Sequence, residues 1–211
     1  MQSIWDFFKH LTNPQDIIHY GGLILLLIVV FAETGLLIGF FLPGDYLLFI
    51  AGMICATKPE VLIVNIYWLI VLMSLAAIIG NFTGYWFGRK VGPKLFKRED
   101  SLLFKKRYVE STKVFYDKHG AKTIILGRFL PYIRTFAPVL AGVIKVHFGR
   151  FVIYSVVGAL AWVGSFVTIG YKLGTYEWVQ DHIGYIVIGL IAATSTPLLI
   201  AYLRNKKRRS S

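Results

Sequence analysis

The sequence predicts an all-α polytopic membrane protein. We expect an inverted repeat of two re-entrant helical hairpins, each followed by a transmembrane helix, with a further transmembrane helix at the C-terminus. Three observations predict this class: a strongly apolar composition, three long uncharged runs, and two interrupted apolar segments that resemble each other.

The composition and the uncharged runs indicate membrane-spanning helices. Of the 211 residues, 56% are hydrophobic and only 16% are charged, whereas soluble domains carry about a quarter charged residues. A helix needs about 20 apolar residues to cross the hydrocarbon core. Continuous apolar runs favour helices over strands, whose apolar residues would alternate. The runs that meet this length are 61–88, 151–171 and 183–203.

Two other apolar segments are interrupted by proline and by charge. Residues 33–57 contain FLPGD, in which Pro43 should end a helix and Asp45 places an acid at membrane depth. Residues 121–146 contain FLPYIRTFAP, again with a charge just after a proline. Non-helical backbone at that depth requires surrounding protein or a watery cavity. We therefore predict two re-entrant hairpins, the first entering from outside and the second from inside.

The two interrupted segments begin units that match in order. Three motifs recur in the same order. FLP occurs at 41–43 and again 88 residues later at 129–131, and Ala-Gly occurs at 51–52 and 90 residues later at 141–142. A GxKxG motif occurs at 88–92 and 82 residues later at 170–174. Because the spans that follow are predicted to cross in opposite directions, the units would be inverted. Inverted repeats with broken helices point to the substrate site of a transporter. A cytoplasmic N-terminus would require a crossing near 17–32, and those 16 residues are short for a span.

The charge distribution predicts the topology. Between Arg89 and Lys118 there are ten Lys or Arg against four acids, and the tail adds five more bases. Positively charged loops lie in the cytoplasm, so we expect a cytoplasmic C-terminus. Because the basic residues lie beside membrane spans, the topology accounts for the net charge of +12, and we expect no nucleic-acid partner. The whole chain is expected to be one membrane domain, with a retained lead-in at 1–20, a basic cytoplasmic loop at 89–118 and a basic tail at 204–211.

The sequence gives no sign of an enzyme, a cofactor or a metal. It has a single cysteine, Cys55, its five histidines form no spaced ligand set, and it contains neither a Walker loop nor a serine elbow. We expect membrane lipids as its surroundings, and a homo-oligomer is compatible with the sequence.

Four charged residues in the apolar segments are the candidate site residues. Glu33 and Asp45 are the only acids in the apolar segments. If the hairpins meet, these acids face Arg128 and Arg134, and each charge offsets the desolvation of the other. Two alternatives stay open: a lock between the hairpins, or a binding site, for which arginine supplies the preferred fork for phosphate oxygens.

Other residues in these segments have weaker assignments. Asn81 could form a hydrogen bond between helices or line the cavity. The prolines are expected to hold Arg134 away from a regular helical face. Interface anchors are expected among four tryptophans, Trp68, Trp86, Trp162 and Trp178.

These motifs together resemble the DedA family, whose domain is called SNARE-associated or VTT, over roughly residues 20–175. The resemblance lies in Glu33 with FLPGD, in GNFTGYWFGRKVG at 80–92, and in GRFLPYIRTFAPVLAG at 127–142. The chain departs from it at Asn81, where members often have Asp, and at Tyr132, where many have Gly.

The resemblance implies a bacterial inner-membrane transporter of lipids, with members linked to undecaprenyl phosphate or phospholipid movement and others to proton-coupled cation exchange. We expect a flippase for a phosphate-bearing lipid, with Arg128 and Arg134 binding the head group. Glu33 and Asp45 would neutralise the empty site and couple transport to protons. The alternatives are a proton-coupled cation antiporter, which supports membrane potential or pH homeostasis, and a scaffold that transports nothing.

Overall fold

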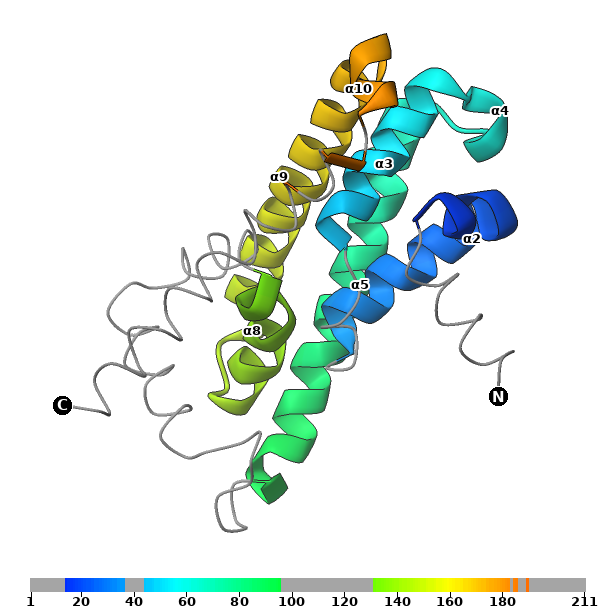
Figure 1. The fold of residues 1–211 in the computed structure, drawn as a ribbon. Coiled ribbons are helices and arrows are strands. Elements are labelled where there is room, and N and C mark those ends of the chain that lie inside the picture. Colours follow the sequence, from blue (N-terminus) through cyan, green and yellow to red (C-terminus); the bar gives the residue numbers. More distant parts are fainter. Residues whose placement is uncertain (1–13, 37–43, 96–130, 183, 186–188, 190–211) are drawn as a thin grey trace, which may run out of the picture.

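A computed structural model of the chain describes residues 14–36, 44–95, 131–182, 184, 185 and 189. Arg128, the predicted span at 183–203 apart from three residues, the tail and most of the basic loop lie outside the described residues. Within the described part every regular element is a helix. The helices, in chain order, are α2 (Pro14–Gly35), α3 (Gly44–Thr57), α4 (Pro59–Leu62), α5 (Ile66–Leu95), α8 (Pro131–Val143), α9 (Phe148–Gly174) and α10 (Glu177–Asp181) (Figure 1).

Two helices are long and apolar enough to cross a membrane. They are Ile66–Val91 within α5 and Phe148–Gly174, which is α9; they correspond to the predicted runs 61–88 and 151–171. One face of each helix exposes large apolar side chains, including Val71, Leu75 and Ile79 on α5. By contrast, α3 has 14 residues and spans about 21 Å, too short for a crossing.

Local hydrogen bonds set the helix boundaries, and these differ from the predicted ones. The long helix begins at Ile66 and not at residue 61, because the Asn65 side chain accepts a hydrogen bond from the Trp68 backbone N–H at 3.0 Å, a helix N-cap. Before it, α4 ends at Leu62, and its C-cap residue Ile63 adopts the left-handed conformation, with φ of 54°. Residue 33, the predicted start of the first hairpin, lies inside α2.

The expectation that two prolines keep Arg134 off a regular helix is wrong. Arg134 lies within α8, which begins at Pro131 and contains Pro138 in its interior. A proline is tolerated in the first turn, because no intrahelical partner exists there for the missing N–H. Pro138 removes one hydrogen bond from the helix, but α8 packs along α5 on that side, and this packing holds the helix together.

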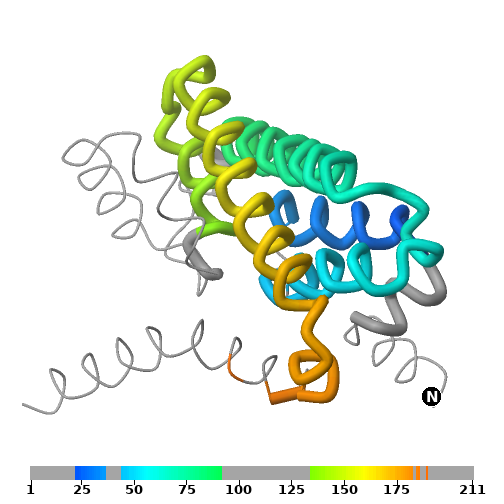
Figure 2. Tube along the Cα trace, turned by 90° about the horizontal axis from the view of Figure 1, so that it is seen from above, coloured from blue at the N-terminus to red at the C-terminus, as the bar shows by residue number. Residues whose placement is uncertain are grey.

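Close glycine contacts join the helices in pairs: α3 lies along α9, and α8 lies along α5 (Figures 1 and 2). A methyl group on Gly52 would overlap the Val167 carbonyl, and one on Gly170 would overlap the Phe49 carbonyl. In the other pair, a methyl on Gly88 or on Gly142 would overlap a carbonyl of the facing helix, of Val139 or Tyr85 respectively. The backbones of each pair are therefore in direct contact, which small residues permit.

The first helix joins this arrangement through α5. Gly35 of α2 and Gly80 of α5 face each other so closely that a methyl on either would meet the backbone of the other helix. This contact places the end of α2, and with it Glu33, beside the start of α3 and the middle of the molecule. The largest apolar cluster fills the space between α2, α3, α5 and α9.

Candidate functional site

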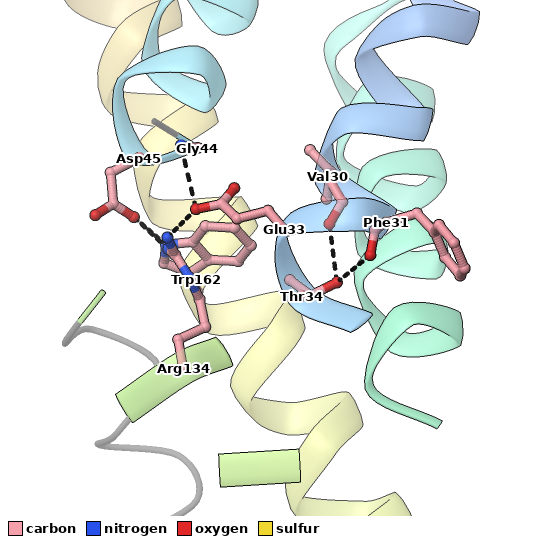
Figure 3. A network of polar contacts seen from close by, with 8 residues as sticks. All are labelled: Val30, Phe31, Glu33, Thr34, Gly44, Asp45, Arg134 and Trp162. Carbon is pink, nitrogen blue, oxygen red and sulfur yellow. Dashed lines mark hydrogen bonds and ion pairs between the residues drawn. The ribbon is translucent and has the colours of Figure 1, made fainter. Parts of the chain in front are cut away.

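Three of the predicted site residues come together in the middle of the molecule, with a fourth residue that the sequence did not indicate (Figure 3). Glu33 lies near the end of α2, Asp45 in the first turn of α3 and Arg134 in the first turn of α8. Trp162 comes from the middle of α9. The fold thus brings together side chains that are 101 residues apart in the case of Glu33 and Arg134.

The Arg134 guanidinium bridges both acids. Its Nη2 donates to Glu33 Oε1 and its Nη1 to Asp45 Oδ1. The side chain of Arg134 is 3% exposed, that of Glu33 2% and that of Asp45 12%. A buried charge of this kind needs an opposite charge and hydrogen bonds to offset its desolvation, and Arg134 has two such partners.

The helix start at α3 supports the Glu33 carboxylate. Its Oε1 accepts a hydrogen bond from the Gly44 backbone N–H at 3.2 Å, and the start of a helix favours a negative charge. A methyl group on Gly44 would overlap the Glu33 carboxylate. The glycine of FLPGD is therefore required by the acid that packs on it.

Trp162 contacts two of the three charged residues of the bridge, Asp45 and Arg134. Its Nε1–H donates to Asp45 Oδ1 at 2.9 Å, and Arg134 Cζ lies 4.2 Å from the centre of its ring, a cation–π contact. The side chain is completely buried, so Trp162 is not one of the interface anchors expected among the tryptophans. The sequence carries no signal for this, because a tryptophan within an apolar run is equally expected at the membrane surface and in the core.

One donor and one acceptor of the cluster are unused. Arg134 Nε and Glu33 Oε2 are buried and have no hydrogen-bond partner among the described residues. Buried polar groups without a partner are rare and destabilising. Among the described residues, Arg134 Nε–H therefore lacks an acceptor, and Glu33 Oε2 lacks a proton or a donor.

Asn81 forms the interhelical hydrogen bond that was one of its two predicted roles. Its side-chain Nδ2 donates to Ser155 Oγ at 3.0 Å, and both residues are buried. The bond joins α5 to α9.

Within the described ranges there is also no group of three His, Cys, Asp or Glu residues that could hold a metal ion.

Comparison with known proteins identifies the family. The VTT domain model matches residues 42–172. The chain is 43% identical over 206 residues to Protein DedA of Escherichia coli strain K12, which covers 96% of this chain and 93% of that protein. It is 38% identical over 192 residues to an uncharacterized membrane protein of Mycobacterium tuberculosis strain H37Rv, covering 90% and 83% of the two chains. Inner membrane protein YqjA of Escherichia coli strain K12 is 30% identical over 177 residues, covering 82% and 77%.

No solved structure matches the chain. The matched domain contains Asp45, Arg134 and Trp162, and the alignment with Protein DedA extends over nearly all of both chains. The names of these relatives describe membrane proteins, in agreement with the apolar helices α5 and α9. The chain is therefore a membrane protein and belongs to the DedA family of VTT-domain proteins.

Proposed function

We propose that this protein moves a phosphate-bearing lipid, undecaprenyl phosphate or a phospholipid, between the leaflets of the bacterial inner membrane. Arg134 binds the head group, together with Arg128, while the lipid tail stays in the bilayer. The observation that carries this proposal is the buried Arg134 guanidinium, which is held by two acids and a ring face and whose Nε–H has no hydrogen-bond partner among the described residues. Arginine matches phosphate oxygens with a planar fork.

The proposed architecture is an inverted repeat of two re-entrant hairpins, each followed by a spanning helix. The glycine contacts support it, because they occur at matched positions. From Gly52 to Gly142 the offset is 90 residues, as it is from Phe49 to Val139. From Gly88 to Gly170 it is 82 residues, as it is from Tyr85 to Val167. In this arrangement α3, from the first hairpin, packs on α9, the spanning helix of the second unit. Likewise α8, from the second hairpin, packs on α5, the spanning helix of the first unit.

Protonation of Glu33 is the proposed coupling step. Arg134 binds Oε1 of this carboxylate, and Oε2 has no partner among the described residues. A proton on Oε2 would neutralise Glu33 while the guanidinium is still in place, and would weaken its hold on Arg134. Burial favours the neutral carboxyl and the arginine favours the ionised one, so a proton gradient can shift the balance. The released guanidinium then binds phosphate.

Transport in proteoliposomes tests the proposal. We would measure the movement of undecaprenyl phosphate and of a fluorescent phospholipid, with and without a pH gradient, for the wild type and Arg134→Lys. The lysine keeps the charge but loses the fork. We expect at least a tenfold loss, since one charge-assisted hydrogen bond contributes about 1.5–3 kcal/mol. The matched control is Arg150→Lys, the same change at an exposed position.

Thermal unfolding of the same samples separates a site from a lock. If the charges only hold the hairpins together, Arg134→Lys should lose transport activity in proportion to its loss of thermal stability. Under this hypothesis, a variant that is as stable as the wild type should also transport as well as the wild type. Full transport by a folded Arg134→Lys protein would contradict phosphate binding by Arg134.

The second candidate function is a proton-coupled cation antiporter. The observation that favours it is the charge of the described cluster: two carboxylates and one guanidinium leave a formal charge of −1, which suits a proton or a cation. In this case neither lipid moves above the protein-free background. Ion flux in the same vesicles would then require Glu33 and Asp45, and would survive Arg134→Lys.

A further inference from the structure

A second arginine is held in a fixed position, at the far end of α5 beside the turn between α8 and α9. The buried Tyr85 hydroxyl donates to the Val146 carbonyl at 2.6 Å and accepts from Arg89 Nη1 at 2.7 Å. The guanidinium also lies 5.9 Å from the centre of the Tyr85 ring. Unlike Arg134, Arg89 is exposed, and no carboxylate of the described residues forms an ion pair with it. Among the described residues, the Arg89 charge is therefore oriented by Tyr85 and is not neutralised by an acid.

The turn next to Arg89 holds a lysine where glycine is the usual residue. The Lys145 N–H bonds to the Gly142 carbonyl and the Val146 N–H to the Ala141 carbonyl, the hydrogen-bond pattern of a Schellman motif. Lys145 occupies its left-handed position, with φ of 57°. Glycine adopts this conformation without the steric penalty that a side chain brings. The Lys145 side chain is exposed at this turn, so its charge is available to a ligand.

The two ends of the described structure differ in charge. At the end formed by the α8–α9 turn, the charged residues whose side chains the structure describes are four bases and no acid, Arg89, Lys90, Lys145 and Arg150. At the opposite end, where α4 and α10 lie (Figure 1), the side chains that the structure describes include two bases and three acids, Lys58, Lys172, Glu60, Glu177 and Asp181. The formal charges are therefore +4 at the first end and −1 at the second. The first end is attractive to anions.

Exposed aromatic rings lie beside the bases. Trp86 is 47% exposed and Phe148 is 36% exposed; their ring centroids are 5.7 Å apart, and Phe148 also contacts the Tyr85 ring at 5.4 Å. The patch is therefore continuous from α5 to the start of α9. Tryptophan prefers the level of lipid head groups, where its ring meets acyl chains and its N–H meets polar groups.

We propose that Arg89 and Lys145, flanked by Trp86 and Phe148, bind the phosphate head group of an anionic phospholipid in the surrounding leaflet. Arg89 presents a fixed fork to the phosphate oxygens, and Lys145 adds a point charge. The aromatic rings contact the glycerol and the first acyl carbons. This exposed site is separate from the buried Arg134 cluster and does not depend on whether the protein transports lipid.

Native mass spectrometry of the detergent-purified full chain tests the site. Phosphatidylglycerol and phosphatidylcholine with identical acyl chains would be titrated, and the ratio of their binding constants measured. Arg89→Gln should lower the preference for phosphatidylglycerol about fivefold, as expected for one basic residue at a lipid surface. Lys172→Gln removes the same charge from an exposed residue at the opposite end of α9, and should leave the preference unchanged.

Lys145→Gly separates lipid binding from turn stability. Glycine suits the left-handed position, so we expect a melting temperature no lower than that of the wild type together with a loss of lipid preference similar to that of Arg89→Gln. An unchanged preference in Arg89→Gln or Lys145→Gly would overturn the proposal. So would an equal loss in Lys172→Gln, which would assign the preference to net charge and not to this site.

Discussion

At the residue scale, the position of Arg134 results from three interactions with different directions. Two carboxylates bind its terminal nitrogens, and the Trp162 ring covers one face of the guanidinium. Removal of one partner from a buried ion pair costs about 3–5 kcal/mol, because the other charge stays buried. The arginine therefore has one well-defined place while the cluster is complete, and it becomes free to bind another group only when an acid is neutralised or displaced.

Trp162→Phe should weaken this cluster without opening it. Phenylalanine keeps an aromatic face for Arg134 but removes the indole N–H that bonds Asp45. A hydrogen bond to a charged group contributes about 1.5–3 kcal/mol, so we expect a loss of that size in the free energy of unfolding, and a larger loss for Trp162→Leu, which also removes the ring. Thermal unfolding in detergent measures both.

Trp68→Phe is the matched control for this substitution. Trp68 is 60% exposed, and an exposed substitution of this kind changes stability by less than about 0.5 kcal/mol. Equal stability of Trp162→Phe and the wild type would show that the indole N–H does not support Asp45.

The sequence identified the charged members of the site but not the tryptophan. A charge within an apolar segment is costly enough to demand an explanation, and this singled out Glu33, Asp45 and Arg134. A tryptophan in an apolar helix has no such cost, and it is equally expected at the membrane surface or in the core. Only the pairing of α9 with α3 shows that Trp162 faces Asp45.

At the element scale, hydropathy predicted the two long apolar helices of the described residues, α5 and α9, and local chemistry decided where α5 begins. The Asn65 cap moved the start of α5 to Ile66, a shift that a hydropathy pattern cannot show, because Val61, Leu62 and Ile63 are as apolar as the helix itself. The expected proline break failed for α8 since Pro131 stands in the first turn, where no backbone N–H is needed.

The glycine contacts between the paired helices lead to a prediction about stability. Gly52→Ala and Gly142→Ala each place a methyl group against a carbonyl of the facing helix, so the helices must move apart. Overpacking of this kind costs about 1–3 kcal/mol. We expect both variants to unfold at a lower temperature than the wild type, by similar amounts, as measured by thermal unfolding in detergent.

Gly164→Ala is the control, since this glycine of α9 has no neighbouring atom within 4 Å of an added methyl. Alanine favours a helix interior by about 1 kcal/mol over glycine, so this variant should be as stable as the wild type or more stable. A loss in Gly164→Ala equal to that in Gly52→Ala would show that the glycines act through helix flexibility and not through close packing.

At the scale of the whole molecule, the buried cluster connects the two helix pairs. Asp45 and Trp162 belong to the pair α3 and α9, whereas Arg134 belongs to the pair α5 and α8. Any movement of one pair against the other must therefore break the contacts of Arg134. The matching motifs predicted two similar units, but not which helices pair, because a small-residue surface on α3 fits an equally small surface on either long helix.

The charge difference between the ends predicts the orientation of α9 in the membrane. Lys145 lies just before α9 at the basic end, and Lys172 lies near its other end. Basic segments stay in the cytoplasm. Single cysteines at these positions, Lys145→Cys and Lys172→Cys, would be made in a Cys55→Ala background, which removes the one native thiol. A membrane-impermeant maleimide should label residue 172 in spheroplasts and residue 145 only in inside-out vesicles.

Each outcome of the labelling has a different meaning. The 27 residues of α9 extend about 40 Å, more than the roughly 30 Å hydrocarbon core, so its ends should be reached from opposite sides. Labelling of both cysteines from the same side would show that α9 does not cross. Reversed labelling would show that α9 crosses with the basic end outside. The basic loop at 89–118 begins with Arg89 at this end, so its assignment to the cytoplasm would then be wrong.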